Sequence, residues 1–267
     1  MAELDFESAS LEEILAAYFS EGCVLLRNFV RPPSLVQFIR FVENLYEEIE
    51  EIHIQPRHLQ ARNLLPFHEH LFHDKHYALL AQVFGDNEYE VSSETATRRI
   101  DVAAGDGEPW QAPLVLHLDS FFHPLPFTVN FWVPFRDCGI DAPSLAVVRF
   151  PFSEILEYSG FGRVSDEDAG PCLPEYPGWN FEKFDKKMFA LAIDELEAVA
   201  DFWHTFADRI WAPCYSFGDA MMSSNWTLHF TNALPAMTQR RSNIELRFTS
   251  RRTLAEITRL HSQLRTG

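Results

Sequence analysis

The sequence predicts a mainly β protein with flanking helices, in which many short strands form a sandwich or barrel. Up to about residue 51, apolar residues recur at helical spacing. After Asn87 the chain is instead divided into short stretches rich in Val, Ile, Thr and aromatic residues, separated by turn residues such as 105–107 and 139–143. The expected strands span 88–101, 113–120, 127–134, 144–150, 220–230 and 243–250.

Two helices are expected near the N-terminus. Ser10 can cap the first one, because Glu13 stands at the capping-box spacing and Gly22 follows the last helical residue. Apolar positions at helical spacing after Pro33 predict the second. The helical region therefore spans about 10–51, with helices over 10–20 and 34–51 and a short apolar strand over 23–26.

Residues 52–76 are expected to form a loop that contains six histidines. Two pairs, His68 with His70 and His73 with His76, have a spacing that metal ligands can use. No carboxylate or thiolate completes either set with clear geometry. Packing and surface positions are therefore favoured over a metal site for these residues.

Residues 151–216 interrupt the series of short expected strands. This insertion begins rich in Gly, Pro and aromatic residues and continues with a helical pattern over about 181–211. We expect this insertion to be a lid over the substrate, while a rigid structural or dimer-forming insert is the alternative. No repeat or linker divides the chain, so residues 1–267 are expected to form a single domain.

The composition excludes several classes of function. With 22 basic and 39 acidic residues, the net charge of −17 argues against nucleic acid and against an anionic membrane surface. No apolar run approaches the 18 or so residues that span a bilayer. The four cysteines form no C-x-x-C pair, so a zinc ribbon or disulfide framework is not expected, and a cytoplasmic location is.

The sharpest motif is His117-Leu118-Asp119, at the end of an apolar run. Residues i and i+2 of a strand point to the same face, so imidazole and carboxylate would lie side by side. A second imidazole from another strand would complete the 2-His-1-carboxylate triad of non-haem Fe(II) oxygenases. The motif alone is weakly specific, since composition predicts about 1.6 His-x-acid triplets in such a chain.

His229 is the candidate for that second imidazole, since it lies in a late β-like segment after a Gly218-Asp219 turn. Arg240 and Arg241 follow it. An Arg that faces the metal can hold a carboxylate through two parallel hydrogen bonds, which a dicarboxylate co-substrate requires. The alternative is that this Arg pairs with one of the many surface acids.

The order of these motifs resembles the phytanoyl-CoA dioxygenase (PhyH) family of Fe(II)/2-oxoglutarate-dependent oxygenases. The shared features are His-x-Asp, a Trp on the next strand, Gly-Asp ten residues before a second His, and an Arg after it. Residues 18–29 resemble the family's opening helix, Gly and strand, and 131–148 its strand, turn and strand. The resemblance covers about 10–50, 88–150 and 217–250. It implies a double-stranded β-helix core, which is a jelly-roll, cupin-like architecture.

The resemblance implies that His117, Asp119 and His229 bind Fe(II), with 2-oxoglutarate and O2 as co-substrates. Asp119 also indicates a hydroxylase or another oxidative enzyme in place of a halogenase, because related halogenases carry Ala or Gly at that position. Residues 149–153 depart from a Pro-Gly-Ser-His turn that is frequent in the family, and the insertion 151–216 is longer than usual. Both departures lie where substrate would be selected, so the resemblance does not identify the substrate.

The family's co-substrate arginine falls on Arg240 or Arg241, and the spacing to Phe248 favours Arg241. Trp132 falls where the family has an aromatic residue near 2-oxoglutarate. Two polar residues of the same expected strand alternate with apolar neighbours and are therefore expected to face the interior near 2-oxoglutarate. These are Thr128 and Asn130.

Four residues are candidates for contact with substrate. His123 follows Asp119 by four residues and either lies at the mouth of the site or packs behind it. Arg98 and Arg99 precede the metal strand and either meet substrate or pair with surface acids. Trp179 lies in the insertion, where closing over substrate and plain packing are both open.

We therefore expect an Fe(II)/2-oxoglutarate-dependent dioxygenase that hydroxylates a small molecule and releases succinate and CO2. The acidic composition and the presence of only four lysines, Lys75, Lys183, Lys186 and Lys187, favour a neutral or cationic substrate over a coenzyme A thioester. Two rivals stay open. One is a cupin-like metalloenzyme that does not use 2-oxoglutarate, and the other is a non-catalytic small-molecule binding module on the same barrel.

Overall fold

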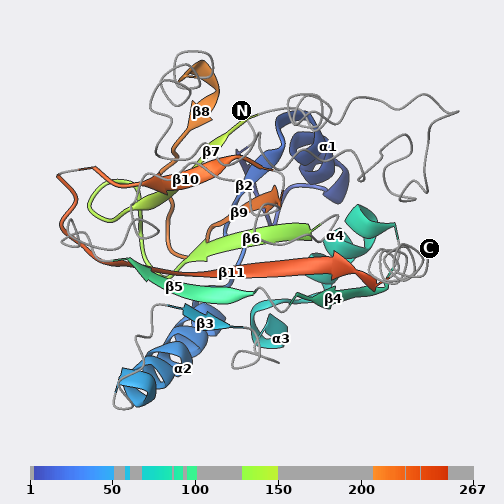
Figure 1. The fold of residues 1–267 in the computed structure, drawn as a ribbon. Coiled ribbons are helices and arrows are strands. Elements are labelled where there is room, and N and C mark those ends of the chain that lie inside the picture. The colour runs from blue at the N-terminus through green and yellow to red at the C-terminus, as the bar shows by residue number, and fades with distance from the viewer. Residues whose placement is uncertain are drawn as a thin grey trace, which may run out of the picture.

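The computed structural model contains a large mixed sheet, a small antiparallel sheet and helices packed on the large one (Figure 1). The strand order is β1-β2-β9-β6-β11-β5-β3 in the large sheet, where β4 also pairs with β11, and β10-β7-β8 in the small sheet. The structure describes residues 3–50, 58–60, 68–85, 87–92, 95–100, 128–149, 207–225, 227–234 and 236–251.

The helices are α1 (Leu11–Glu21), α2 (Pro32–Glu50), α3 (His68–Leu71) and α4 (Asp74–Phe84), with a 3-10 turn at Ala207–Arg209. The strands of the large sheet are β1 (Glu3–Asp5), β2 (Cys23–Arg27), β3 (His58–Gln60), β4 (Tyr89–Val91), β5 (Ala96–Ile100), β6 (Thr128–Pro134), β9 (Ala220–Ser224) and β11 (Arg241–Ser250). The small sheet contains β7 (Ser144–Val148), β8 (Ile210–Trp211) and β10 (His229–Asn232).

The N-terminal helices form for the reasons that the sequence indicates. Ser10 accepts a hydrogen bond from the Glu13 N–H at 3.2 Å, and the Glu13 carboxylate accepts one from the Ser10 N–H at 2.8 Å. Gly22 ends α1 in the left-handed region, at a φ of 72°. The expected loop at 52–76 is wrong in part, because β3, α3 and the start of α4 lie within it.

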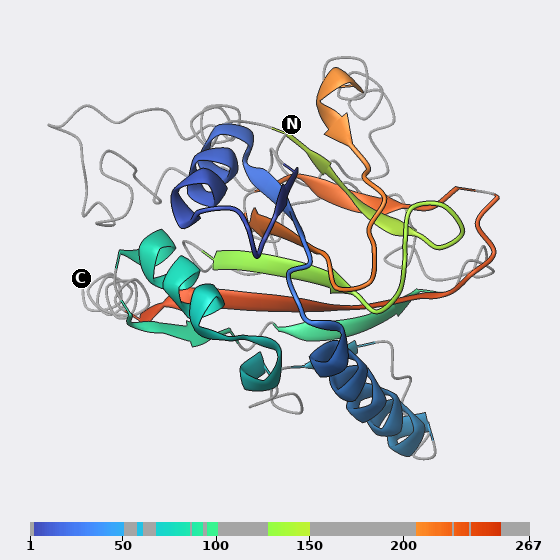
Figure 2. The same cartoon turned by 180° about the vertical axis from the view of Figure 1, so that it is seen from behind.

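Apolar residues of the central strands divide between the two faces of the large sheet. On β6, for example, Val129, Phe131 and Val133 point to one face and Trp132 to the other. The first face packs against α1, α4 and the first half of α2, which lie in front of the sheet in Figure 2. This helix-covered face forms the main hydrophobic core.

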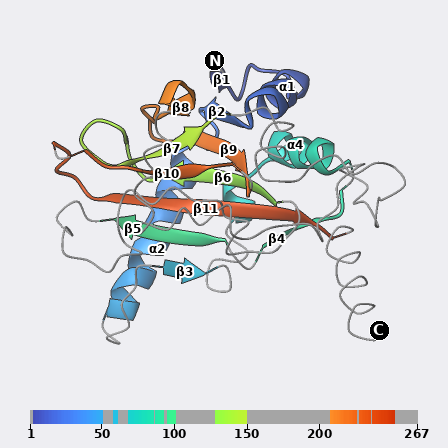
Figure 3. The ribbon, with the colours of Figure 1, turned by 45° about the horizontal axis from the view of Figure 1, so that its top comes forward.

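The small sheet lies over the other face, as Figure 3 shows for β7 and β10. Leu145 and Val147 of β7 pack in one buried cluster with Trp132 of β6 and Met221 of β9. The two sheets therefore face each other across this second, smaller core. The expected strand 220–230 is in fact two strands, since β9 belongs to the large sheet and β10 to the small one.

The Gly218-Asp219 turn, which precedes β9, packs against the end of β2 and the residues that follow it. Gly218 has a φ of 95°, and a Cβ there would stand 2.7 Å from the Val30 carbonyl oxygen, so only Gly fits. The Asp219 carboxylate accepts hydrogen bonds from the N–H groups of Asn28, at 3.1 Å, and Ser216, at 2.7 Å, and forms an ion pair with Arg27. This turn therefore fixes where the strand before His229 begins.

His76 on α4 is a satisfied core histidine. Its side chain is almost fully buried, its Nε2 donates to the Phe29 carbonyl at 2.8 Å, and its Nδ1 accepts from the His73 N–H at 3.1 Å. Burial, and next the charge of His73, lower the pKa of His76 to about 3. Both ring nitrogens of His76 form hydrogen bonds. A packing role is therefore favoured over the alternative, a metal site formed by His73 and His76.

His76 should make stability depend on pH. Its pKa is lower in the folded than in the unfolded state, so its contribution is complete above about pH 6.5 and is lost as the pH falls towards 3. From pH 6.5 to 5 the loss is about 2 kcal/mol. Urea unfolding should show a shallower pH dependence for His76→Gln than for wild type, whereas substitution of the exposed His70 on α3 by Gln should match wild type. Equal slopes for His76→Gln and wild type would contradict the assignment.

Other expectations can be compared with the structure only where their residues are described. No described helix is long and apolar enough to cross a bilayer. The described cysteines, Cys23, Cys138 and Cys214, carry free thiols. The described end of the insertion, 207–216, contains a 3-10 turn and β8 in place of the expected helix. The rest of 151–206 and the expected strand 113–120 lie outside the described residues.

Candidate functional site

The face of the large sheet that meets the small sheet is polar along β6 and β11. Paired residues of antiparallel strands share a face. The pairs on this face are Thr128 with Thr249, Asn130 with Arg247, Trp132 with Glu245, and Pro134 with Asn243. Arg241 lies two residues before Asn243 and therefore on the same face. The polar side chains face the space between the sheets and are buried or half-buried.

Arg241 is the outstanding group of this face. Its side chain is fully buried, and no described carboxylate forms an ion pair with it. Its Nη1 donates to the Ser144 carbonyl at 3.4 Å, at the start of β7, whereas its Nε has no hydrogen-bond partner. Burial lowers the pKa of Arg241 to about 10, so the guanidinium still carries its charge at neutral pH. A buried cation without a counter-charge is costly, which indicates a place for an anion.

Trp132 forms one wall of this place. The Arg241 guanidinium carbon lies 5.2 Å from the centre of the Trp132 ring, in cation–π contact. Tyr215 packs against the same indole at 4.8 Å between ring centres, and its hydroxyl donates to the Leu145 carbonyl at 2.9 Å. The indole N–H is buried and has no partner. A fixed, unused donor thus stands beside the arginine.

His229 opens β10 on the opposite sheet. It pairs with Val147, so both side chains share the face that packs against the large sheet. Its Nδ1 lies 2.8 Å from the Thr227 carbonyl oxygen, which can only accept, so Nδ1 carries the proton. Neutral imidazole then has its lone pair on Nε2. Metal-binding histidines are commonly oriented by such a backbone hydrogen bond.

The described residues fit a metal ligand and a co-substrate anion on facing sheets. Arg241 contacts the first residue of β7, Ser144, and His229 pairs with Val147, three residues further along the same strand. Within the described ranges no group of three His, Cys, Asp or Glu side chains forms a metal site. Four predicted site residues lie outside the described residues, so their roles stay predictions. These are His117, Asp119, His123 and Trp179.

Arg98 also faces the space between the sheets, since it pairs with Asn243. Its Nε lies 3.3 Å from one carboxylate oxygen of Glu245, and Nη2 of Arg247 lies 2.5 Å from the other. The Glu245 carboxylate therefore forms ion pairs with the guanidinium groups of both Arg98 and Arg247. Together with Arg241, the described residues of this face carry three positive charges against one negative charge, in a chain whose net charge is −17. The interior of this site attracts anions although the protein as a whole repels them.

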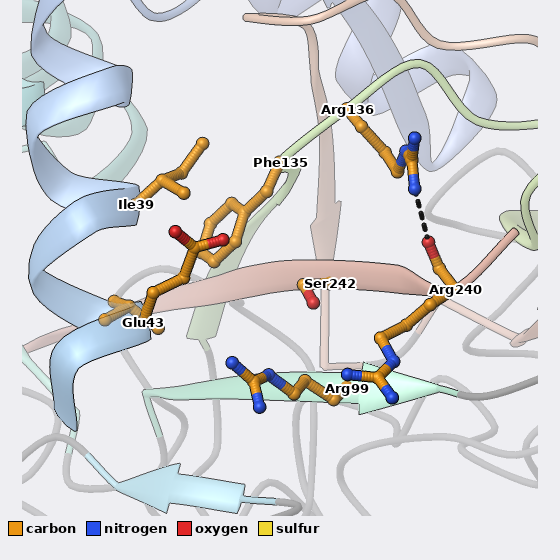
Figure 4. A pocket seen from close by; sticks show the side chains of 8 residues that line it. Ile39, Glu43, Arg99, Phe135, Arg136, Arg240 and Ser242 are labelled. Atoms are coloured by element: carbon orange, nitrogen blue, oxygen red, sulfur yellow. Dashed lines mark hydrogen bonds between the residues drawn. The ribbon is translucent and has the colours of Figure 1, made fainter. Parts of the chain in front are cut away.

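Arg99 and Arg240 are not brought together with Arg241. Arg99 pairs with Ser242, so both side chains point to the helix-covered face of the sheet. Arg99, Ser242 and Arg240 line a pocket of about 310 Å³ beside α2 (Figure 4). Arg136 donates to the Arg240 carbonyl at 3.2 Å. The remaining lining residues are Ile39, Val42, Glu43 and Phe135.

Sequence reasoning missed Asn243, which is fully buried and has no partner for its amide nitrogen or its amide oxygen. The strand expected from the sequence begins at Asn243 and therefore does not include Arg241. The signal was the two-residue alternation, which places Asn243 on the face of Arg241 once β11 is extended back to residue 241. Thr128 and Asn130 lie on that face as expected.

Comparison with known proteins identifies the fold. No protein-family model matches the chain, and no curated protein matches it in sequence. The fold is similar to that of the epimerase SnoN in complex with Fe3+, alpha ketoglutarate and nogalamycin RO, with a TM-score of 0.54, 14% identity, and coverage of 90% of this chain and 83% of SnoN. A second SnoN structure, described as a non-heme alpha ketoglutarate dependent epimerase from nogalamycin biosynthesis, matches with a TM-score of 0.54, 13% identity, and coverage of 90% and 82%.

AviO1 from Streptomyces viridochromogenes Tue57 has the same TM-score of 0.54, with 14% identity and coverage of 91% of this chain and 97% of AviO1. Identities this low show the fold and leave the reaction open. The chain thus shares its mostly β fold with a non-heme alpha ketoglutarate dependent enzyme over nearly its whole length.

Proposed function

We propose that the protein is an Fe(II)/2-oxoglutarate-dependent oxygenase that hydroxylates a small molecule on a double-stranded β-helix core. One observation carries the proposal. The fully buried Arg241, which has no acidic partner among the described residues, faces the space that His229 also faces, from the opposite sheet. The fold shared with SnoN and the PhyH-like order of motifs support the same class.

Iron with 2-oxoglutarate would supply oxidation of a substrate C–H bond by O2, giving the alcohol, succinate and CO2. His229, whose Nδ1 donates to the Thr227 carbonyl, and the predicted His117 and Asp119 would hold the iron. Arg241 would hold the distal carboxylate of 2-oxoglutarate. The packed rings of Trp132 and Tyr215 would exclude water from that carboxylate, which would strengthen its contact with Arg241.

The substrate is proposed to be a neutral or cationic small molecule. Because Arg241 is assigned to the co-substrate, this proposal rests on the composition of the chain, with its net charge of −17 and only four lysines. The predicted Asp119 supports a hydroxylase or another oxidative enzyme over a halogenase, and hydroxylation is the outcome that we propose. The cupin-like rival differs in one respect that can be measured, since it would not convert 2-oxoglutarate.

Succinate release tests this function. The full chain is incubated in air with Fe(II), 2-oxoglutarate and a panel of neutral and cationic small molecules, and succinate is quantified. Succinate that requires both Fe(II) and the chain, and that increases with one member of the panel, is expected. Conversion of a panel member without succinate would favour the cupin-like rival. The absence of any conversion would favour the binding module.

A further inference from the structure

Asn243 is an anomaly in the core of the large sheet. Its exposed fraction is 0%, and both polar atoms of its amide lack a hydrogen-bond partner. A buried amide that is left unpaired destabilises a protein by about 1–3 kcal/mol. Nearly all buried polar groups in folded proteins are satisfied, so an amide with neither atom satisfied requires an explanation, such as a bound water, ion or ligand.

The position of Asn243 relates it to two other unsatisfied donors. Arg241 precedes it by two residues on the same face, and Trp132 stands opposite Glu245, two residues after it. Because the Arg241 guanidinium and the Trp132 ring approach each other at 5.2 Å, they meet over the stretch of sheet that contains Asn243. Arg241 Nε, Trp132 Nε1 and the Asn243 amide nitrogen are therefore three unused donors of one small area.

The chemistry of these donors selects a ligand. Three N–H donors and one positive charge match a carboxylate group, which accepts several hydrogen bonds and carries one negative charge. The one unused acceptor, the Asn243 amide oxygen, requires a donor in addition, which a single ordered water can provide. Glu245 does not oppose an anion here, since Arg98 and Arg247 both pair with it.

We propose that Asn243 and Trp132 complete a carboxylate cradle around Arg241, and that Asn243 determines whether this cradle accepts a carboxylate. This inference rests on the proposed function for the identity of the ligand, the distal carboxylate of 2-oxoglutarate. It adds Asn243 to the proposed site as the residue that determines specificity for a carboxylate. The cradle itself requires only a carboxylate and no metal.

Two substitutions distinguish this role from a structural one. Asn243→Leu removes the unsatisfied amide at similar size, so the ligand-free chain should melt at the same or a higher temperature while carboxylate binding weakens about 10- to 100-fold. Asn243→Asp puts a carboxylate beside Arg241, so it should stabilise the ligand-free chain and abolish binding. A structural asparagine would instead lower the melting temperature in both variants. Ser242→Ala, on the opposite face of β11, is the matched control.

The test measures melting temperatures of the full chain with glutarate, with its uncharged analogue glutaramide, and with 2-oxoglutarate. Glutarate should stabilise wild type and Ser242→Ala without added metal, glutaramide should not, and both Asn243 variants should lose the effect. Retained stabilisation in the Asn243 variants, or its absence in wild type, would overturn the cradle. If the glutarate effect depends on Asn243 but no succinate forms from 2-oxoglutarate, the cradle stands and the proposed function fails.

Discussion

Substitution of Arg241 by Lys should raise the 2-oxoglutarate concentration needed for half-maximal succinate formation by about 100-fold. A lysine ammonium does not present the planar pair of donors that holds a carboxylate. Truncating one partner of a buried charge pair also costs about 2–5 kcal/mol. Arg241 is fully buried and contacts both Trp132 and Ser144, so a shorter, differently shaped cation would leave these contacts unmade.

Arg240→Lys is the matched control for this prediction. Arg240 is the adjacent residue, but it is exposed and lines the pocket beside α2 on the other face of the sheet (Figure 4). Its substitution should leave the 2-oxoglutarate requirement within about twofold of wild type. The sequence left the choice between the two arginines open, with a preference for Arg241. A large increase in the 2-oxoglutarate requirement for Arg240→Lys, with no change for Arg241→Lys, would instead place the co-substrate site in the pocket beside α2.

His229→Ala should weaken Fe(II) binding by about 100-fold or more. Loss of a residue that merely orients a metal ligand costs about 10- to 100-fold in metal affinity, so loss of a ligand itself should cost at least as much. Equilibrium dialysis of Fe(II) under nitrogen measures the affinity directly. The fold should persist, because His229 is only half-buried at the start of β10.

His70→Ala supplies the comparison, since His70 is exposed on the short helix α3. It should bind Fe(II) like wild type, and succinate formation should be unchanged. Wild-type Fe(II) affinity in His229→Ala would remove His229 from the metal site. The metal would then have to be sought among the histidines of 53–76 and the residues outside the described ranges.

Local signals in the sequence were sufficient for the N-terminal elements. The capping box and Gly22 placed the first helix within one residue of α1, and the periodicity placed the second within two residues of α2 at its start. At α4 the same rules failed, because His76 accepts the His73 N–H in the way that Glu or Gln usually does. A helix start made from two histidines is not recognisable from residue preferences.

Long-range geometry was not predictable from one-dimensional patterns. The expected strand 220–230 is interrupted where Thr227 turns the chain by accepting from the Ser224 N–H and donating to the Gly22 carbonyl. No Gly or Pro marks this turn, yet it transfers His229 to the small sheet. Alternation did place Thr128 and Asn130 on the interior face, but which of Arg98 and Arg99 shares that face depends on the register with β11.

The central claim is that Arg241 and an Fe(II) site in this fold bind 2-oxoglutarate together, and one titration tests it most directly. Calorimetric titration of 2-oxoglutarate into the full chain under nitrogen, with and without Fe(II), gives stoichiometry and affinity. We predict one 2-oxoglutarate per chain, tighter binding when Fe(II) is present, and loss of binding in Arg241→Gln. No binding by wild type with Fe(II), or equal binding by wild type and Arg241→Gln, would contradict the account.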